Sequence, residues 1–199
     1  MRHNHLSNHT FHWCQSSGLT PELEKPGLLL PRPLHGAFHE DGSRQSDGRR
    51  PADVYVPRWK RGMPVAFDFA VTSGLRTSNL SASISDCRSA TVLYEDFKRE
   101  HNSTELDCQQ QGIHFTPLVV EAVGGGWGPA ADKAFAQLAK LKTSVSGERR
   151  SVVLSQLYQN LGIILHRENA RAVLRRSSVM QCNMSLHTLA SAASLQSPP

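Results

Sequence analysis

The stretch AFDFAVT, residues Ala66–Thr72, decides the fold of this chain. Its residues alternate as they do in a β-strand, where successive side chains point to opposite faces. One face carries Phe67, Phe69 and Val71, and the other carries small residues around Asp68. An isolated buried carboxylate costs several kcal/mol unless it is paired, protonated or bound to a metal. The stretch therefore predicts a buried strand whose small-residue face carries an acid that is paired, protonated or bound to a metal.

A second alternating stretch, RRPADVYVPRW, comes shortly before and predicts a strand at residues 52–56. The intervening KRGMP is typical of a hairpin connection. Such a hairpin would bring Asp53 beside Asp68 on one face. Two adjacent carboxylates repel by about 1 kcal/mol even when well screened. A divalent cation removes that repulsion, and oxygen ligands of this kind suit Mg²⁺ or Mn²⁺.

Each aspartate also has a structural interpretation. An arginine could pair with one of the two aspartates, and the candidates are Arg50, Arg58 and Arg76. Asp53 could instead bind backbone groups at the start of its strand. The sequence leaves both interpretations open beside the metal site.

The remaining elements follow from periodicity and from turn residues. Helices are predicted at residues 3–17, 90–101, 130–142 and 149–175, with Ser85 and Asp86 as candidate caps of the second. Further strands are predicted at Gly27–Leu30 and at Phe115–Val123, the latter buried on both faces. Residues 33–50 are polar and aperiodic and predict a flexible loop. This order predicts an α/β fold, with a small mixed β-sheet flanked by helices.

We divide the chain into an N-terminal helical segment (1–18), an α/β domain (19–143), a basic helix (147–176) and a disordered tail (177–199). No run of 18 apolar residues occurs, so we expect no membrane association. The N-terminus lacks the apolar stretch of a secretory signal, which indicates an intracellular protein that is not secreted.

The four cysteines are widely spaced and form no CxxC pair, so we expect reduced thiols and no zinc site. The histidines near the N-terminus are interpreted as the surface of a helix rather than as metal ligands.

The net charge is +5 and the sequence pI is about 9.3. Positive charge is concentrated near the C-terminus, where arginines outnumber acids between residues 149 and 176. A polyanionic partner would suit this composition, and so would a solvated helix face. The arginines that would contact nucleic acid are Arg149, Arg150, Arg171, Arg175 and Arg176.

The segments RRPADVYVP, AFDFAVT, YEDFKREH and FTPLVVEAVGGGWG together resemble the restriction-like endonuclease domain of non-LTR retrotransposons, which accompanies a reverse transcriptase. That domain is a variant of the PD-(D/E)XK nuclease superfamily, and the resemblance covers residues 27–141. It implies a restriction-endonuclease-like fold and a magnesium- or manganese-dependent DNA endonuclease, with a possible nuclear location. The chain would be a fragment or a stand-alone descendant of such a polyprotein.

The resemblance assigns roles to three residues of this sequence. Asp53 and Asp68 would be catalytic and would bind the metal, and Lys98 would act from the following helix. Two positions differ from the family's pattern: Ala52 separates the proline from Asp53, and Ala70 occupies the usual lysine position. Further candidates near the site are Glu24, Tyr94, His101 and Glu121.

Other interpretations of the further candidates stay open. Glu24 could pair at the surface, and Glu121 could pair with an arginine of the last helix. Tyr94 and His101 share the helical stripe of Lys98 and could contact phosphate. The alternatives to an active nuclease are an inactive nucleic-acid-binding or interaction module with the same fold, and a gene fragment without function.

Overall fold

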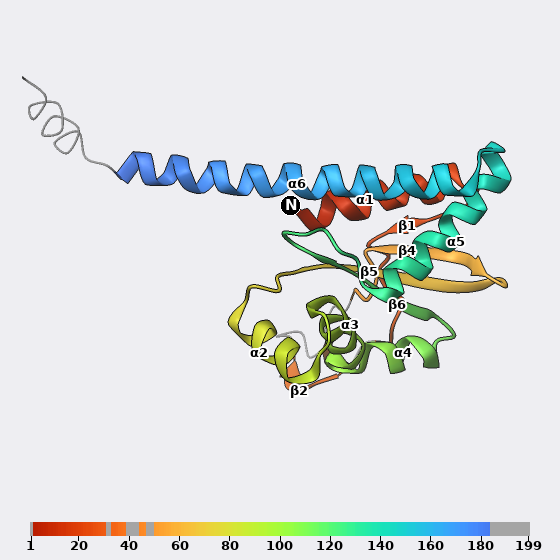
Figure 1. Cartoon of the computed structure of the whole chain (residues 1–199). Helices are drawn as coiled ribbons and strands as arrows, with labels where there is room; N and C mark the ends of the chain where they lie inside the picture. The colour runs from red at the N-terminus through yellow and green to blue at the C-terminus, as the bar shows by residue number, and fades with distance from the viewer. Residues whose placement is uncertain (1, 31–32, 39–43, 47–49, 184–199) are drawn as a thin grey trace, which may run out of the picture.

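A four-stranded mixed sheet forms the centre of the protein (Figure 1). The computed structural model describes residues 2–30, 33–38, 44–46 and 50–183. The strands of the sheet are β1 (Glu22–Leu23), β4 (Val54–Lys60), β5 (Met63–Thr72) and β6 (His114–Glu121), in the spatial order β1-β4-β5-β6. The first three strands run antiparallel, and β6 lies parallel to β5. The predicted α/β class with a small mixed sheet is therefore confirmed.

The hairpin of β4 and β5 is the element that the sequence predicts most directly. Val54 pairs with Phe67, so the strands adopt the register that places the two aspartates opposite each other. The connection is tight because Arg61 and Gly62 both take positive φ angles, of 54° and 78°. Two successive positive φ values match the right-handed twist of the flanking strands. The strand β4 continues through Pro57 to Lys60, with a register irregularity after Val56.

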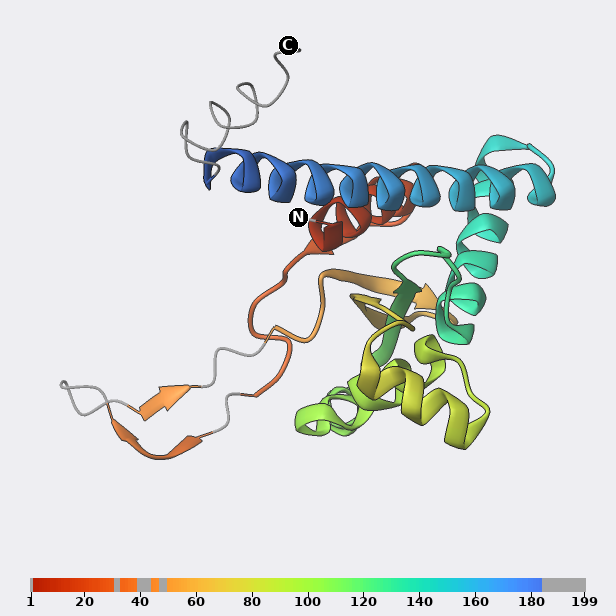
Figure 2. The ribbon, with the colours of Figure 1, turned by 60° about the vertical axis from the view of Figure 1, so that its left-hand side comes forward.

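Two layers of helices cover the two faces of the sheet (Figures 1 and 2). One face packs against α1 (Arg2–Ser16) and α5 (Pro129–Ser146), and α6 (Arg150–Asn183) packs on these two helices. This main core joins Phe67 and Phe69 of β5 to Leu6 of α1 and to Leu161 of α6. The other face carries a smaller cluster that includes Ala66, Phe115 and Cys108. The predicted separation of large and small residues along β5 is confirmed.

The smaller face is covered by α3 (Ala90–Glu100) and α4 (Thr104–Gln110), which both contact β6. Residues 115–120 of β6 are all buried, as a strand covered on both faces requires. The hydrophobic run of β6 is thus explained by a helix layer on each side.

The strand predicted at Gly27–Leu30 is wrong, because these residues form a turn and β1 lies earlier. Gly27 has a φ angle of +71°, which extended backbone does not allow. Leu29 is nevertheless buried in the smaller cluster. The apolar run therefore packs against the sheet without pairing with it.

The prediction of a flexible loop at 33–50 is wrong for part of that range. Residues Pro33–Phe38 (β2) and Arg44–Ser46 (β3) pair as an antiparallel hairpin. Figure 2 shows these strands projecting away from the main sheet. Residues 39–43 and 47–49 lie outside the described part of the chain.

The helical segments between β5 and β6 also differ from the prediction. The Ser-rich stretch contains a helix, α2 (Thr77–Asp86), and α3 is capped by Ser89 rather than by Ser85 or Asp86. The Ser89 hydroxyl accepts a hydrogen bond from the Val92 amide, as an N-cap does. A short 3-10 turn, η1 (His101–Ser103), and α4 follow α3, and neither was predicted.

The last helix, α6, runs on to Asn183, so residues 177–183 are helical rather than a disordered tail. Residues 184–199 lie outside the described part. The first half of α6 packs on α1 and α5 and buries Val153, Leu157, Leu161 and Leu165 in the main core, whereas its second half projects beyond the body of the molecule (Figure 1).

Among the described residues, Cys14 and Cys87 are free thiols, and Cys14 and Cys108 are buried. Burial raises the pKa of the Cys14 thiol to about 12, so this side chain behaves as a small core residue. No helix in the described ranges combines the length and the apolar character that crossing a bilayer requires.

Candidate metal centre

Asp53 and Asp68 meet where β4 begins beside the middle of β5. The Asp53 amide donates to the Phe67 carbonyl oxygen at 2.9 Å, which holds Asp53 at the strand entrance. Its carboxylate Oδ2 accepts the Phe69 amide hydrogen at 2.6 Å. Asp53 thus extends the pairing by one residue before β4, and its side chain lies at the point where β4 begins. The hairpin that the sequence predicts is the reason the two acids lie together.

Lys98 reaches this pair of acids from α3. Its Nζ lies 2.7 Å from Asp68 Oδ2, and both side chains are mostly buried, with exposed fractions of 25% and 17%. The alternative arginine partners for Asp68 are not used among the described ion pairs. The structure therefore brings Asp53, Asp68 and Lys98 into one site.

His3, from the N-terminal helix, completes the group. Its Nε2 lies 2.8 Å from Asp53 Oδ2. One ligand atom from each of His3, Asp53 and Asp68 lies within 4.8 Å of the others. Two carboxylates and an imidazole at such spacing form a set that can hold one divalent cation.

Burial and neighbouring charges shift the protonation of this group. Burial raises the pKa of the Asp68 carboxyl, and the nearby Lys98 ammonium only partly opposes that effect. The hydrogen bond to Asp53 raises the pKa of His3, against a smaller opposite effect of its burial. Ionisation of the Asp68 carboxyl is therefore less favourable in the fold than in water, even with the Lys98 ammonium beside it.

A small pocket of about 240 Å³ lies over Asp68 and Lys98. Its wall includes His101, Asn102 and Thr104, which come from the 3-10 turn and the start of α4. The His101 ring packs 5.0 Å from the ring of Phe97 on α3. Of the further candidates, His101 is the one that lines this pocket together with the acid and the lysine.

The side chains of the other further candidates make contacts outside this pocket. Tyr94 packs against Phe97, with ring centroids 5.4 Å apart. Glu24 pairs with Arg50 at 2.9 Å at the surface, although its amide donates to the Asp53 carbonyl. Its carboxylate is not part of the metal-binding group among the described residues.

Glu121 stabilises a turn rather than pairing with an arginine of α6. Its carboxylate accepts backbone amide hydrogens from Gly74 at 3.3 Å, from Val123 at 2.8 Å and from Gly124. It therefore joins the glycine-rich loop after β6 to the end of β5.

The arginines predicted to contact nucleic acid do not form one cluster. Arg149 and Arg150 lie at the start of α6, and Arg171, Arg175 and Arg176 lie toward its other end. At a helical rise of about 1.5 Å per residue, about 30 Å separates Arg150 from Arg171. Arg171 also pairs with Glu168 at 2.5 Å. Two separate basic regions replace the single one suggested by the sequence.

His3 is not among the site residues predicted from the sequence, because the histidines of α1 are interpreted there as a helix surface. His3 and His5 are partly exposed, at 39% and 41%, yet each contacts an acid: His3 contacts Asp53, and His5 lies 3.0 Å from the buried Glu168 on α6. The sequence signal that could have pointed to His3 is the high number of histidines in α1, several of which lie on the inner side of that helix. Nothing in the local pattern says which of them contacts a residue 50 positions away.

Comparison with known proteins adds no family to this geometry. No protein-family model matches the chain, and no curated protein matches it.

Proposed function

We propose that this protein is a divalent-metal-dependent endonuclease that hydrolyses phosphodiester bonds in DNA. The observation that carries the proposal is the convergence of His3, Asp53, Asp68 and Lys98 from α1, β4, β5 and α3. Paired acids with a nearby lysine on a mixed sheet are what the resemblance to the PD-(D/E)XK nucleases predicts. A DNA substrate would also be consistent with a nuclear location.

The donor set suits magnesium or manganese. Two carboxylates are hard oxygen ligands, and the imidazole of His3 adds a nitrogen that favours Mn²⁺ over Mg²⁺. A bound cation would polarise the scissile phosphate and lower the pKa of a coordinated water. The same charge would relieve the cost of burying the Asp68 carboxylate.

The chain's own residues prepare this site for an anionic substrate. The Phe69 amide and His3 fix the orientation of the Asp53 carboxylate. Lys98 holds a positive charge beside Asp68, where it can stabilise the negative charge that develops on a phosphate in the transition state. His101 and Asn102, on the pocket wall, offer nitrogen donors to a phosphate oxygen.

The test is nicking of a supercoiled plasmid with Mg²⁺, with Mn²⁺, and with EDTA. We expect nicking with either metal, faster with Mn²⁺, and none with EDTA. Gel electrophoresis measures the conversion to open-circular DNA. Absence of nicking by the purified full chain with every divalent metal would overturn the proposal.

The second candidate is an inactive nucleic-acid-binding module with the same site geometry. It is favoured by Ala70, which is buried and replaces the lysine of the usual pattern. It is also favoured by the internal pairing of both acids, Asp53 with His3 and Asp68 with Lys98. This module would bind DNA but leave the plasmid intact in every metal.

His3 provides a test of metal binding that does not depend on cleavage. We expect His3→Asn to weaken Mn²⁺ binding by at least about tenfold, because one of three ligands is lost. Electron paramagnetic resonance of free Mn²⁺ measures the affinity directly. His12→Asn on the exposed side of the same helix is the matched control and should bind Mn²⁺ normally. Equal affinity in His3→Asn and wild type would remove His3 from the site.

A further inference from the structure

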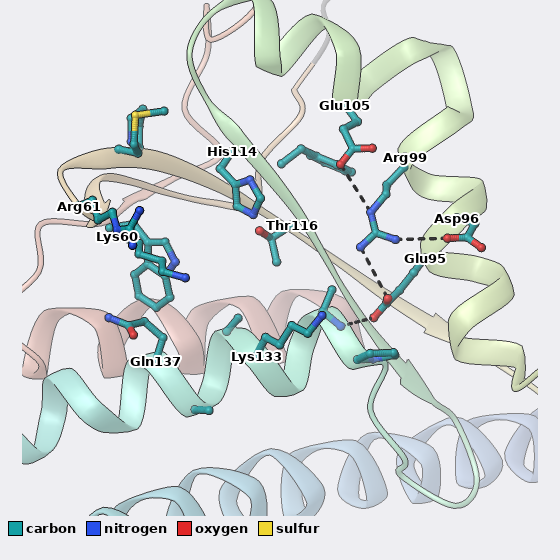
Figure 3. Close-up of a pocket in the computed structure, with 18 of the residues that line it drawn as sticks. Lys60, Arg61, Glu95, Asp96, Arg99, Glu105, His114, Thr116, Lys133 and Gln137 are labelled. Atoms are coloured by element: carbon teal, nitrogen blue, oxygen red, sulfur yellow. Dashed lines mark hydrogen bonds and ion pairs between the residues drawn. The ribbon is translucent and has the colours of Figure 1, made fainter.

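A groove of about 1040 Å³ is lined by the tip of the β4–β5 hairpin, α3, the start of β6 and α5 (Figure 3). Its polar lining includes cationic side chains from three elements: Lys60 and Arg61 at the hairpin tip, Lys133 on α5 and Arg150 at the start of α6. We call these four residues the basic groove. All four are exposed to solvent.

The three acids that line this groove, Glu95, Asp96 and Glu105, are outnumbered by its five cations, which are the four of the basic groove and Arg99. Glu95, Asp96 and Glu105 all lie near the guanidinium of Arg99, at 3.7, 3.3 and 3.6 Å (Figure 3). Glu95 also accepts the Ala130 amide hydrogen at 3.0 Å. By contrast, none of the four residues of the basic groove forms an ion pair with another residue in the described ranges. The groove therefore carries a net positive charge that has no protein counter-ion there.

Rigid elements hold these charges in place. The two-residue turn fixes Lys60 and Arg61, and beneath them the ring of Trp59 packs edge-on against Phe67, with centroids 5.1 Å apart. Arg150 donates to the Ala136 carbonyl oxygen at 3.2 Å, which anchors its guanidinium to α5. Charges held on rigid elements lose less conformational entropy on binding an anion.

We propose that the basic groove binds the phosphate backbone of a nucleic-acid strand. Its volume exceeds what a single phosphate needs, and its cations are spread over three elements rather than gathered around one point. A chain of regularly spaced phosphates matches that spread. Thr116 and Gln137 in the lining add neutral donors for phosphate or sugar oxygens.

The groove and the small pocket over Asp68 are separate, and the buried Phe115 contributes to the lining of both. Lys98 and Arg99, adjacent on α3, line the small pocket and the groove respectively. The proposal rests on the groove's own charges and does not require that the protein cleave DNA.

The test measures binding in EDTA, where no cleavage occurs. Fluorescence anisotropy with a labelled DNA single strand and with its duplex gives the affinity at increasing salt concentrations. For the triple variant Lys60→Gln/Arg61→Gln/Lys133→Gln we expect at least about a tenfold loss of affinity. The slope of log affinity against log salt should fall by about one for each phosphate contact removed.

The matched control removes the same charge from the far end of α6: Arg171→Gln/Arg175→Gln/Arg176→Gln. This variant should keep wild-type affinity. If it loses as much affinity as the groove variant, or if only it loses affinity, the proposal is overturned. Wild type that binds neither the single strand nor the duplex overturns it as well, and would leave an acidic protein as the partner to test.

A second measurement covers the case in which the groove variant does not fold. Bound DNA should protect Lys60 and Lys133 of the wild type from acetylation, as measured by mass spectrometry, while Lys140 stays reactive. Unchanged labelling of the two groove lysines would contradict the proposal. Binding is measured in EDTA and nicking in Mn²⁺, so failure of the groove and failure of cleavage give different results.

Discussion

Asp68→Asn is expected to lower plasmid nicking by at least about 1,000-fold, because it removes a metal ligand and the partner of Lys98 together. The amide has the same shape as the carboxylate but carries no charge. Rates of open-circle formation in Mn²⁺ measure the effect. Asp86→Asn, at the exposed end of α2, is the matched control and should nick at the wild-type rate. Nicking that persists in Asp68→Asn would exclude Asp68 from the reaction.

The same variant is expected to keep or gain stability, which separates loss of chemistry from loss of fold. Burial raises the pKa of the Asp68 carboxyl above its ordinary value of 3.8, so the folded state disfavours its ionised form. The folded protein then holds a proton that the unfolded chain releases, and its stability falls as pH rises from 3.8 through the raised pKa. Asparagine removes that penalty. Lys98, left without its partner, keeps a quarter of its side chain in contact with water.

Melting curves of wild type and Asp68→Asn at several pH values measure this pH dependence of stability directly. The stability of Asp68→Asn relative to wild type should increase with pH across that window and then stay constant. A strongly destabilised Asp68→Asn would instead mean that its pairing with Lys98 supports the fold. The acid would then have a structural role as well.

Gly128→Ala is expected to destabilise the protein by about 2–3 kcal/mol. Gly128 precedes α5 and has φ −74°, an angle that alanine accepts. The difficulty is space, because a Cβ at this position would lie 2.0 Å from Glu95 Oε1. Glu95 is buried and binds the Ala130 amide at the start of α5, so it cannot move without losing that hydrogen bond. Urea unfolding measures the loss.

Gly126→Ala is the matched control in the same loop. A Cβ there meets nothing within 4 Å, so the change in stability should stay within about 0.5 kcal/mol. A double-mutant cycle identifies the cause. In a Glu95→Ala background, Gly128→Ala should cost little, because the atom it displaces is gone. Additive losses in the double variant would show that the contact with Glu95 is not responsible.

Local pattern was sufficient for the elements that carry a strong periodicity. The alternation in β5, the tight turn at Arg61 and Gly62, and the helices α1, α3, α5 and α6 all follow from residue spacing. The pattern fails where an element is short or its packing is not local. The helix α2 is Ser-rich, β1 has two residues, and the apolar run at Gly27 packs without pairing.

The residues of the candidate site likewise divide into those that the sequence could predict and one that it could not. The shared face of Asp53 and Asp68 could be predicted because both lie on one hairpin, where a shift by two residues leaves a side chain on the same face. Their position directly opposite each other depends on the register shift after Val56, which the turn alone does not fix. The contact of Lys98 came from the resemblance and from helical spacing. His3 could not be predicted, since its partner lies 50 residues away and the choice among several histidines depends on how α1 packs.

By itself, the sequence determined the β4–β5 hairpin and the facing of its two acids, because strand periodicity and turn chemistry act over a few residues. Only the tertiary structure decided which histidine approaches Asp53, which acid binds the start of α5, and which cations share a groove. Those choices depend on how α1, α3 and α5 pack around the sheet, and packing joins side chains that no local pattern relates.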